Sequence, residues 1–143
     1  MSRATEFLCG GVNADGRTVE TLLHASDAWL EHHHDWVQWA FPNQDPSFFN
    51  DEAPVWTAEE AASLPPVAVE NLLRLLSRFV RFLDRSDDWR APSDHNHARI
   101  TRVLLCLRDA GRHAEAREFY AFVTAAPEPG ERSRRFWRGA HPE

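Results

Sequence analysis

The sequence predicts an all-α protein, a single domain built as a bundle of six to seven helices. Apolar residues recur with helical spacing along most of the chain, and the alternation expected of β-strands is almost absent. The 143 residues, 43% of them hydrophobic, are enough for one core of ordinary size. We expect the domain over residues 1–126 and a Pro- and Arg-rich tail over residues 127–143.

Short helices are predicted near the N-terminus, over residues 4–8 and 18–24. Gly10 stops the first, and the Asp15-Gly16 pair makes a turn before the second. A third helix is expected over residues 27–41.

Ser26 is a suitable N-cap for this third helix, because its hydroxyl can accept from a free N–H of the first turn. Pro42 ends the helix, since proline cannot continue its hydrogen bonding. Residues 43–54 are then expected to form an ordered loop.

Four more helices are predicted in the second half of the chain. Thr57 and Glu60 have the spacing of a capping box, Pro65 and Pro66 suit the first turn of a long helix, and Gly111 separates the last two. The predicted helices cover residues 58–63, 66–84 and 94–110, then a segment with Ala116, Phe119, Tyr120 and Val123 on one side; one more turn is expected around Phe136 and Trp137.

The helix over residues 66–84 has an apolar stripe on one side and arginines on the other. We interpret the arginines as a solvated charged face. The predicted stripe consists of Leu72, Leu73, Leu76, Phe79, Val80 and Leu83, and the charged face of Arg74, Arg78, Arg81 and Arg85.

Composition and charge exclude several classes of function. The net charge of -6 argues against binding to nucleic acid or to an anionic membrane. No apolar run approaches a membrane span, and Cys9 and Cys106 have no disulfide or zinc spacing. We therefore expect a cytoplasmic protein without cofactors, and its arginine-only basic residues are typical of a GC-rich bacterial genome.

The helix over residues 27–41 carries aromatic side chains on more than one face, which is typical of a central, covered helix. Asp35 and Trp39 form an i,i+4 pair on it. A buried Asp35 would need a cationic partner, because an isolated buried carboxylate is very costly.

His95, Arg99 and Arg102 share one face of the predicted helix over residues 94–110, and we expect this face to meet the His34-Asp35 edge. The contact is either a structural network of Asp35 with Arg99 or Arg102, or a site for an anionic or peptide group. The candidate ligand-binding residues are His34, Asp35, Trp39, His95, Asn96, Arg99 and Arg102, and no catalytic or metal-binding residue is assigned.

Two long blocks carry a resemblance to a known family. HDWVQWAFP at residues 34–42 and HNHARITRVL at residues 95–104 are similar to signature blocks of the opioid growth factor receptor conserved region. PSFFN at residues 46–50, the following Ala53-Pro54, the opening FLCG and Trp89 fit the same order. The likeness covers residues 7–123, and Trp36 and Ala40 stand where the family usually has Tyr and Leu.

The resemblance implies an all-helical domain whose eukaryotic members are described as receptors for an enkephalin-type opioid growth factor. It implies a peptide or protein partner, and membrane association only by analogy with those members.

An enzyme is the alternative hypothesis. His34-Asp35 is a doublet of the kind that metal-dependent hydrolases use, in which His and Asp ligands hold divalent ions that activate water. His24, His32, His33, His95 and His97 could supply further ligands. Nucleophilic catalysis is not indicated, because Ser47, Ser77 and Cys106 lack a Gly-rich elbow or a neighbouring base.

Overall fold

A computed structural model, which describes residues 1–45 and 53–141, confirms the all-α fold class. Within these ranges there is no strand, only one isolated bridge between Asn43 and Val55. The described residues form nine helices: α1 (Arg3–Leu8), α2 (Val19–Leu23), α3 (Asp27–His32), α4 (Trp36–Ala40), α5 (Ala58–Ala62), α6 (Pro66–Arg85), α7 (His95–Asp109), α8 (His113–Thr124) and α9 (Glu131–Ala140).

The number of helices exceeds the predicted six to seven for two reasons. The single helix expected over residues 27–41 is divided into α3 and α4, and the one turn expected near Phe136 is the ten-residue helix α9. Trp137 of α9 is fully buried and donates from Nε1 to the carbonyl of His97 in α7. As far as residue 141, the expected tail is therefore folded onto the other helices.

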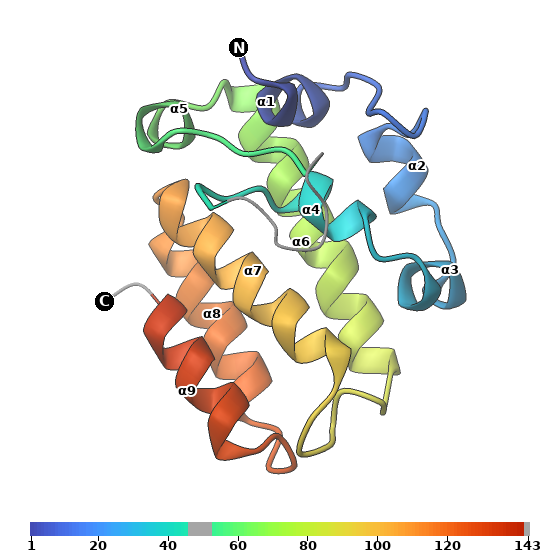
Figure 1. Cartoon of the computed structure of the whole chain (residues 1–143), viewed down its shortest axis with the longest axis vertical. Coiled ribbons are helices and arrows are strands. Elements are labelled where there is room, and N and C mark those ends of the chain that lie inside the picture. Colours follow the sequence, from blue (N-terminus) through green and yellow to red (C-terminus); the bar gives the residue numbers. More distant parts are fainter. Residues whose placement is uncertain (46–52, 142–143) are drawn as a thin grey trace.

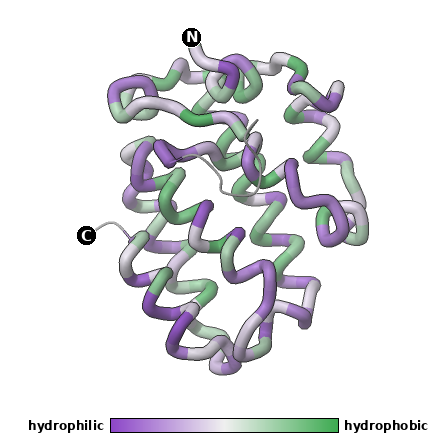
Figure 2. The backbone as a smooth tube through the Cα atoms, viewed as in Figure 1, coloured by the Kyte–Doolittle hydropathy of each residue, from purple (hydrophilic) through white to green (hydrophobic). Residues whose placement is uncertain are grey.

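The fold contains two groups of helices, one packed on α6 and the other on α7. The helices α1 and α2 pack on α6, whereas α8 and α9 pack on α7. Figure 1 shows α7 crossing the middle of the molecule, with α8 and α9 on one side and the shorter α3 and α4 on the other. Hydrophilic and hydrophobic residues alternate along α6 and α7, as expected of helices with one buried face (Figure 2).

Several predicted helix ends are confirmed. Ser26 accepts from the N–H of Trp29 at 3.1 Å, and Gly111 after α7 has a φ of 70°, a conformation that glycine adopts without strain. The capping box of Thr57 and Glu60 is only half formed. Thr57 caps Glu60, but the Glu60 carboxylate accepts from the Ser2 N–H and the Thr5 hydroxyl instead.

The buried stripe of α6 is close to the prediction and is centred differently. Leu73 and Val80 are only partly buried, while other apolar side chains of the helix complete the covered face. The buried residues of α6 are Ala68, Asn71, Leu72, Leu75, Leu76, Arg78, Phe79, Phe82 and Leu83.

Arg78 corrects the expectation that all four arginines of α6 are solvated. Its side chain is only 6% exposed, and its Nη2 donates to Asp27 Oδ1 at 2.7 Å and to the carbonyl of Ala25 at 2.9 Å. Arg85 also pairs with Asp27, at 3.1 Å. These contacts fix the start of α3 against α6.

The same contacts predict a pH dependence of stability. Desolvation raises the pKa of Asp27, but the hydrogen bonds and charges of Arg78 and Arg85 together outweigh it, so this pKa lies below its ordinary value of 3.8. The ionised Asp27 carboxylate therefore stabilises the folded protein. This contribution is complete above pH 3.8 and is lost as the pH falls through the lower, folded-state pKa. Urea unfolding at pH 7 and pH 3 measures it: Asp27→Asn is expected to lose less stability on acidification than the unaltered protein.

Two further sequence predictions concern the loop after residue 42 and membrane-spanning segments. The PSFFN block and most of the loop expected over residues 43–54 lie outside the described residues. In the described ranges, no helix combines the length and the apolar character that crossing a membrane requires.

Candidate functional site

A cleft of about 340 Å³ lies between the start of α4 and one face of α7. Four of the predicted site residues line it: His34, His95, Arg99 and Arg102. The remaining lining residues are the apolar Val37, Ala98 and Leu105 and the uncharged polar Gln38, Asn43 and Thr101. The predicted face of α7 therefore does meet the segment that carries His34.

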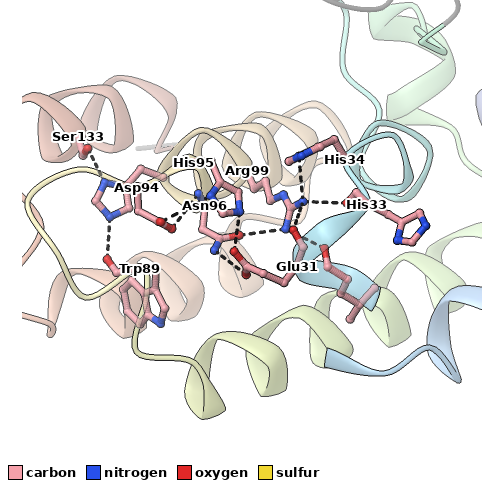
Figure 3. Close-up of polar contacts among 11 residues, drawn as sticks. Glu31, His33, His34, Trp89, Asp94, His95, Asn96, Arg99 and Ser133 are labelled. Carbon is pink, nitrogen blue, oxygen red and sulfur yellow. Dashed lines mark hydrogen bonds and ion pairs between the residues drawn. The ribbon is translucent and has the colours of Figure 1, made fainter. Parts of the chain in front are cut away.

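Arg99 connects α7 to the end of α3. It is only 6% exposed, and its guanidinium donates to the carbonyls of Leu30 at 3.0 Å and His33 at 2.8 Å, and to Asn96 Oδ1 at 3.0 Å (Figure 3). It also lies over the Trp36 ring, 5.5 Å from the ring centroid.

These contacts explain why the predicted helix over residues 27–41 is interrupted. The carbonyl of Leu30 also accepts from Trp36 Nε1 at 2.9 Å, so side chains satisfy groups that a continuing helix would satisfy with its own N–H groups. His33 is extended, with a ψ of 133°, and a new helix starts at Trp36. A cation at the end of α3 also suits the negative end of its dipole.

Arg102 lies one helical turn further along α7 and has few partners among the described residues. Its Nη2 reaches the carbonyl of Gln38 at 3.5 Å, the outer limit of a hydrogen bond. Its Nε is buried and bonds to no atom of residues 1–45 or 53–141. Burial lowers the pKa of Arg102 below its ordinary value, because the charged form is desolvated.

The cleft is electropositive. Of its lining residues in the described ranges none is Asp or Glu, whereas two are Arg. Burial lowers the pKa of Arg99 too, although the charges of Glu31 and Asp94 oppose the shift. Both guanidinium groups stay charged at neutral pH, since arginine keeps its proton in proteins.

Two histidines stand at the edge of the cleft (Figure 3). His95 Nε2 lies 2.7 Å from Glu31 Oε1, and the rings of His34 and His95 meet edge to face at 5.8 Å. Arg99 approaches His34 Nδ1 at 3.4 Å, and because arginine only donates, that nitrogen is the acceptor. The sequence analysis missed Glu31, the partner of His95, since nothing in its helical position distinguishes it from a surface carboxylate.

The other predicted site residues do not line the cleft. Asn96 is fully buried behind it, bridging Arg99 and Glu31. Trp39 is 4% exposed and packs against Phe7, with ring centroids 5.7 Å apart. Six of the seven candidates are thus divided between the cleft, its support and the core, and the seventh, Asp35, is exposed.

Asp35 corrects the main prediction about this segment. The residue is exposed, and the described hydrogen bonds of Arg99 and Arg102 go to other groups, so the expected buried network of Asp35 with these arginines is wrong. The prediction assumed a continuous helix, which would have placed Asp35 on a covered face. The break at His33 turns it to solvent instead.

The histidine-rich segment does not assemble a metal centre within the described ranges. In residues 1–45 and 53–141, no three His, Cys, Asp or Glu side chains gather in a way that could hold an ion. His32 and His33 are exposed, and His33 stacks on Trp29 with centroids 4.1 Å apart.

Comparison with known proteins identifies no relative. No family model, curated protein or solved structure matches the chain.

Proposed function

We propose that the protein is a helical binding module whose cleft between α4 and α7 holds an anionic group, such as the carboxylate of a peptide. The observation that carries the proposal is Arg102, a partly desolvated cation beside an open cleft, whose Nε–H has no partner in residues 1–45 and 53–141. A planar guanidinium can hold a carboxylate or phosphate through two parallel hydrogen bonds.

The cost of desolvating the partly buried Arg102 supports a binding role over a structural one. A buried cation is usually paired, because desolvation without a partner costs several kcal/mol, on the order of the stability of a domain. Arg99 donates to five acceptors of the protein, but among the described residues Arg102 has one hydrogen bond, the long contact to Gln38. An anion in the cleft would supply both the missing charge and the missing acceptors.

The rest of the cleft indicates what accompanies the anionic group. Val37, Ala98 and Leu105 give it an apolar wall, while Gln38 and Thr101 offer hydrogen-bonding groups. The volume of about 340 Å³ lies at the small end of ligand sites. These features favour a carboxylate next to an apolar side chain, as at the C-terminus of a peptide, over a bare inorganic ion.

The resemblance to the opioid growth factor receptor conserved region supports the same choice. Its two long blocks, residues 34–42 and 95–104, supply most of the lining of the cleft. Membership of that family, and with it a role as a peptide receptor, is part of the proposal.

Binding of an enkephalin-type pentapeptide tests it. Calorimetry should detect binding of the peptide with a free carboxyl terminus, and amidation of that terminus should weaken binding by about 10-fold or more, since a charge-assisted hydrogen bond contributes roughly 1.5–3 kcal/mol. Arg102→Met should have a comparable effect on the free acid. The same substitution should leave stability unchanged or raise it, because it removes a desolvated charge and keeps most of the side-chain volume.

Arg108→Met is the matched control, since Arg108 is on the same helix with a side chain 43% exposed and does not line the cleft. It should bind the peptide as the unaltered protein does. Equal affinity for acid and amide, or unaltered binding to Arg102→Met, would refute the carboxylate site. Titration with acetate and phosphate would then show whether the cleft binds any anion.

No comparable observation in the described residues supports the alternative hypothesis of a metal-dependent hydrolase. His34 lines the cleft, but the exposed Asp35 does not, and neither belongs to a ligand cluster within the described ranges.

A further inference from the structure

A second cavity, of about 390 Å³, adjoins the cleft along α7 and contains an unexpected serine. The two hollows share Ala98 and Thr101, so they lie side by side on this helix. Ser133, at the third position of α9, lines the second cavity together with His97 of α7. Neither residue belongs to the cleft described above.

Ser133 and His97 have the geometry of a hydroxyl and its base. Ser133 Oγ lies 2.7 Å from His97 Nδ1, and His97 Nε2 lies 2.7 Å from the carbonyl oxygen of Trp89. A carbonyl only accepts, so Nε2 carries the proton, and in the neutral ring Nδ1 is left to accept from the serine O–H. Figure 3 shows Ser133 and Trp89 at the two ends of this chain of hydrogen bonds.

The base is held rigidly. His97 is 5% exposed, and its ring meets Trp137 edge to face with centroids 5.3 Å apart. Its backbone carbonyl accepts from both Trp137 Nε1 and the Thr101 hydroxyl. A nucleophile, a base within hydrogen-bonding reach and a third group that orients the base together form the general pattern of nucleophilic catalysis.

Backbone donors for a developing negative charge belong to the same helical turn as Ser133. Helix α9 starts at Glu131, its N-cap Gly130 supplies no side-chain cap, and the N–H groups of a first helical turn have no partner within the helix. Ser133 itself belongs to this turn, as does Arg132, which also lines the cavity. Backbone N–H groups in such a position can stabilise an oxyanion.

We propose that Ser133 is a nucleophile activated by His97 and that the cavity accepts carboxylic esters with an apolar acyl group, which the 59% exposed Phe136 would contact. This proposal rests on other residues than the anion-binding cleft and stands independently of it. The new Oγ–C bond forms at the ester carbonyl as the serine proton moves to His97 Nδ1. That proton passes to the departing alcohol as the ester C–O bond breaks. Water, deprotonated by the same nitrogen, then releases the acid and restores the serine.

The test uses a fluorophosphonate probe and the full chain, with peptide mass mapping to locate the adduct. A single adduct on Ser133 is expected, formed as fluoride leaves. His97→Gln should slow its formation by about 100-fold, because general-base assistance of this kind is worth 10²–10⁴-fold. Glutamine can accept from Ser133 and donate to the Trp89 carbonyl but cannot take up the proton, so a purely structural histidine would be rescued by this substitution.

Ser77→Ala is the matched control, because Ser77 is an exposed serine of α6 that does not line this cavity. It should leave labelling unchanged, whereas Ser133→Ala should abolish it, and hydrolysis of p-nitrophenyl butyrate should follow the same order. Absence of an adduct on Ser133, or equal labelling of folded His97→Gln, overturns the proposal. If His97→Gln does not fold, the unaltered protein decides: an adduct on Ser133 alone supports the nucleophile, and adducts spread over several hydroxyls overturn it.

Discussion

Arg99→Ala is expected to lower the free energy of unfolding by about 3 to 5 kcal/mol, which is a large part of the stability of an ordinary domain. The guanidinium donates to carbonyls at the end of α3 and to the side chain of Asn96. It also lies over the face of the Trp36 ring. Removing it leaves buried acceptors without donors, and each such group costs roughly 1–3 kcal/mol. Denaturant unfolding followed by far-UV circular dichroism measures the loss.

Two other variants make this test specific. Arg99→Lys keeps the charge but cannot reproduce the planar fork, so an intermediate loss is expected. Arg81→Ala removes an exposed arginine of α6 and should change stability by about 0.5 kcal/mol or less. An equally small effect of Arg99→Ala would mean that the end of α3 does not depend on this side chain.

Arg99 and Arg102 lie on the same helix but differ in their hydrogen-bond partners. Both are cations on the same face of α7, Arg99 buried and Arg102 partly buried, and the pKa values of both are lowered by desolvation. Within the described residues Arg99 has several close acceptors, whereas Arg102 has one at 3.5 Å and its Nε has none. We therefore expect substitution of Arg99 to act on folding and substitution of Arg102 to act on binding.

The long helices could be predicted from the sequence because their signals are local. Apolar spacing and cap residues such as Ser26 act within one or two turns, and they placed α6 and α7 almost to their ends. The break between α3 and α4 has no such signal. It depends on Arg99, 66 residues beyond His33, so only tertiary contacts reveal it.

The candidate site, like the helices, could be predicted only where its signals are local in the sequence. The i, i+4, i+7 spacing of His95, Arg99 and Arg102 is a local property of α7, and all three line the cleft. The exposure of Asp35 and the role of Glu31 follow from the break in the preceding helix. Ser133 was missed because its base lies 36 residues away, on another helix.

Phe79→Ala is expected to cost about 3 to 5 kcal/mol of stability, through lost burial and the cavity left behind. Phe79 is fully buried in α6 and is the centre of an aromatic cluster. Its ring centroid lies 5.8 to 6.2 Å from those of its neighbours, which come from α4, the segment after α4, α6 and α8. These neighbours are Trp36, Phe41, Phe82 and Phe119.

The position of the cluster gives the substitution a second consequence. Trp36 packs against both Phe79 and Arg99, so loosening of the aromatic cluster should reach the α3–α4 break and the cleft beside it. Thermal unfolding measures the first effect, and the near-UV circular dichroism of the tryptophans measures the second. Phe136→Ala, at a residue 59% exposed, is the matched control and should leave both signals nearly unaltered. Similar melting of the two variants would show that the cluster around Phe79 is not what holds α4 against α6.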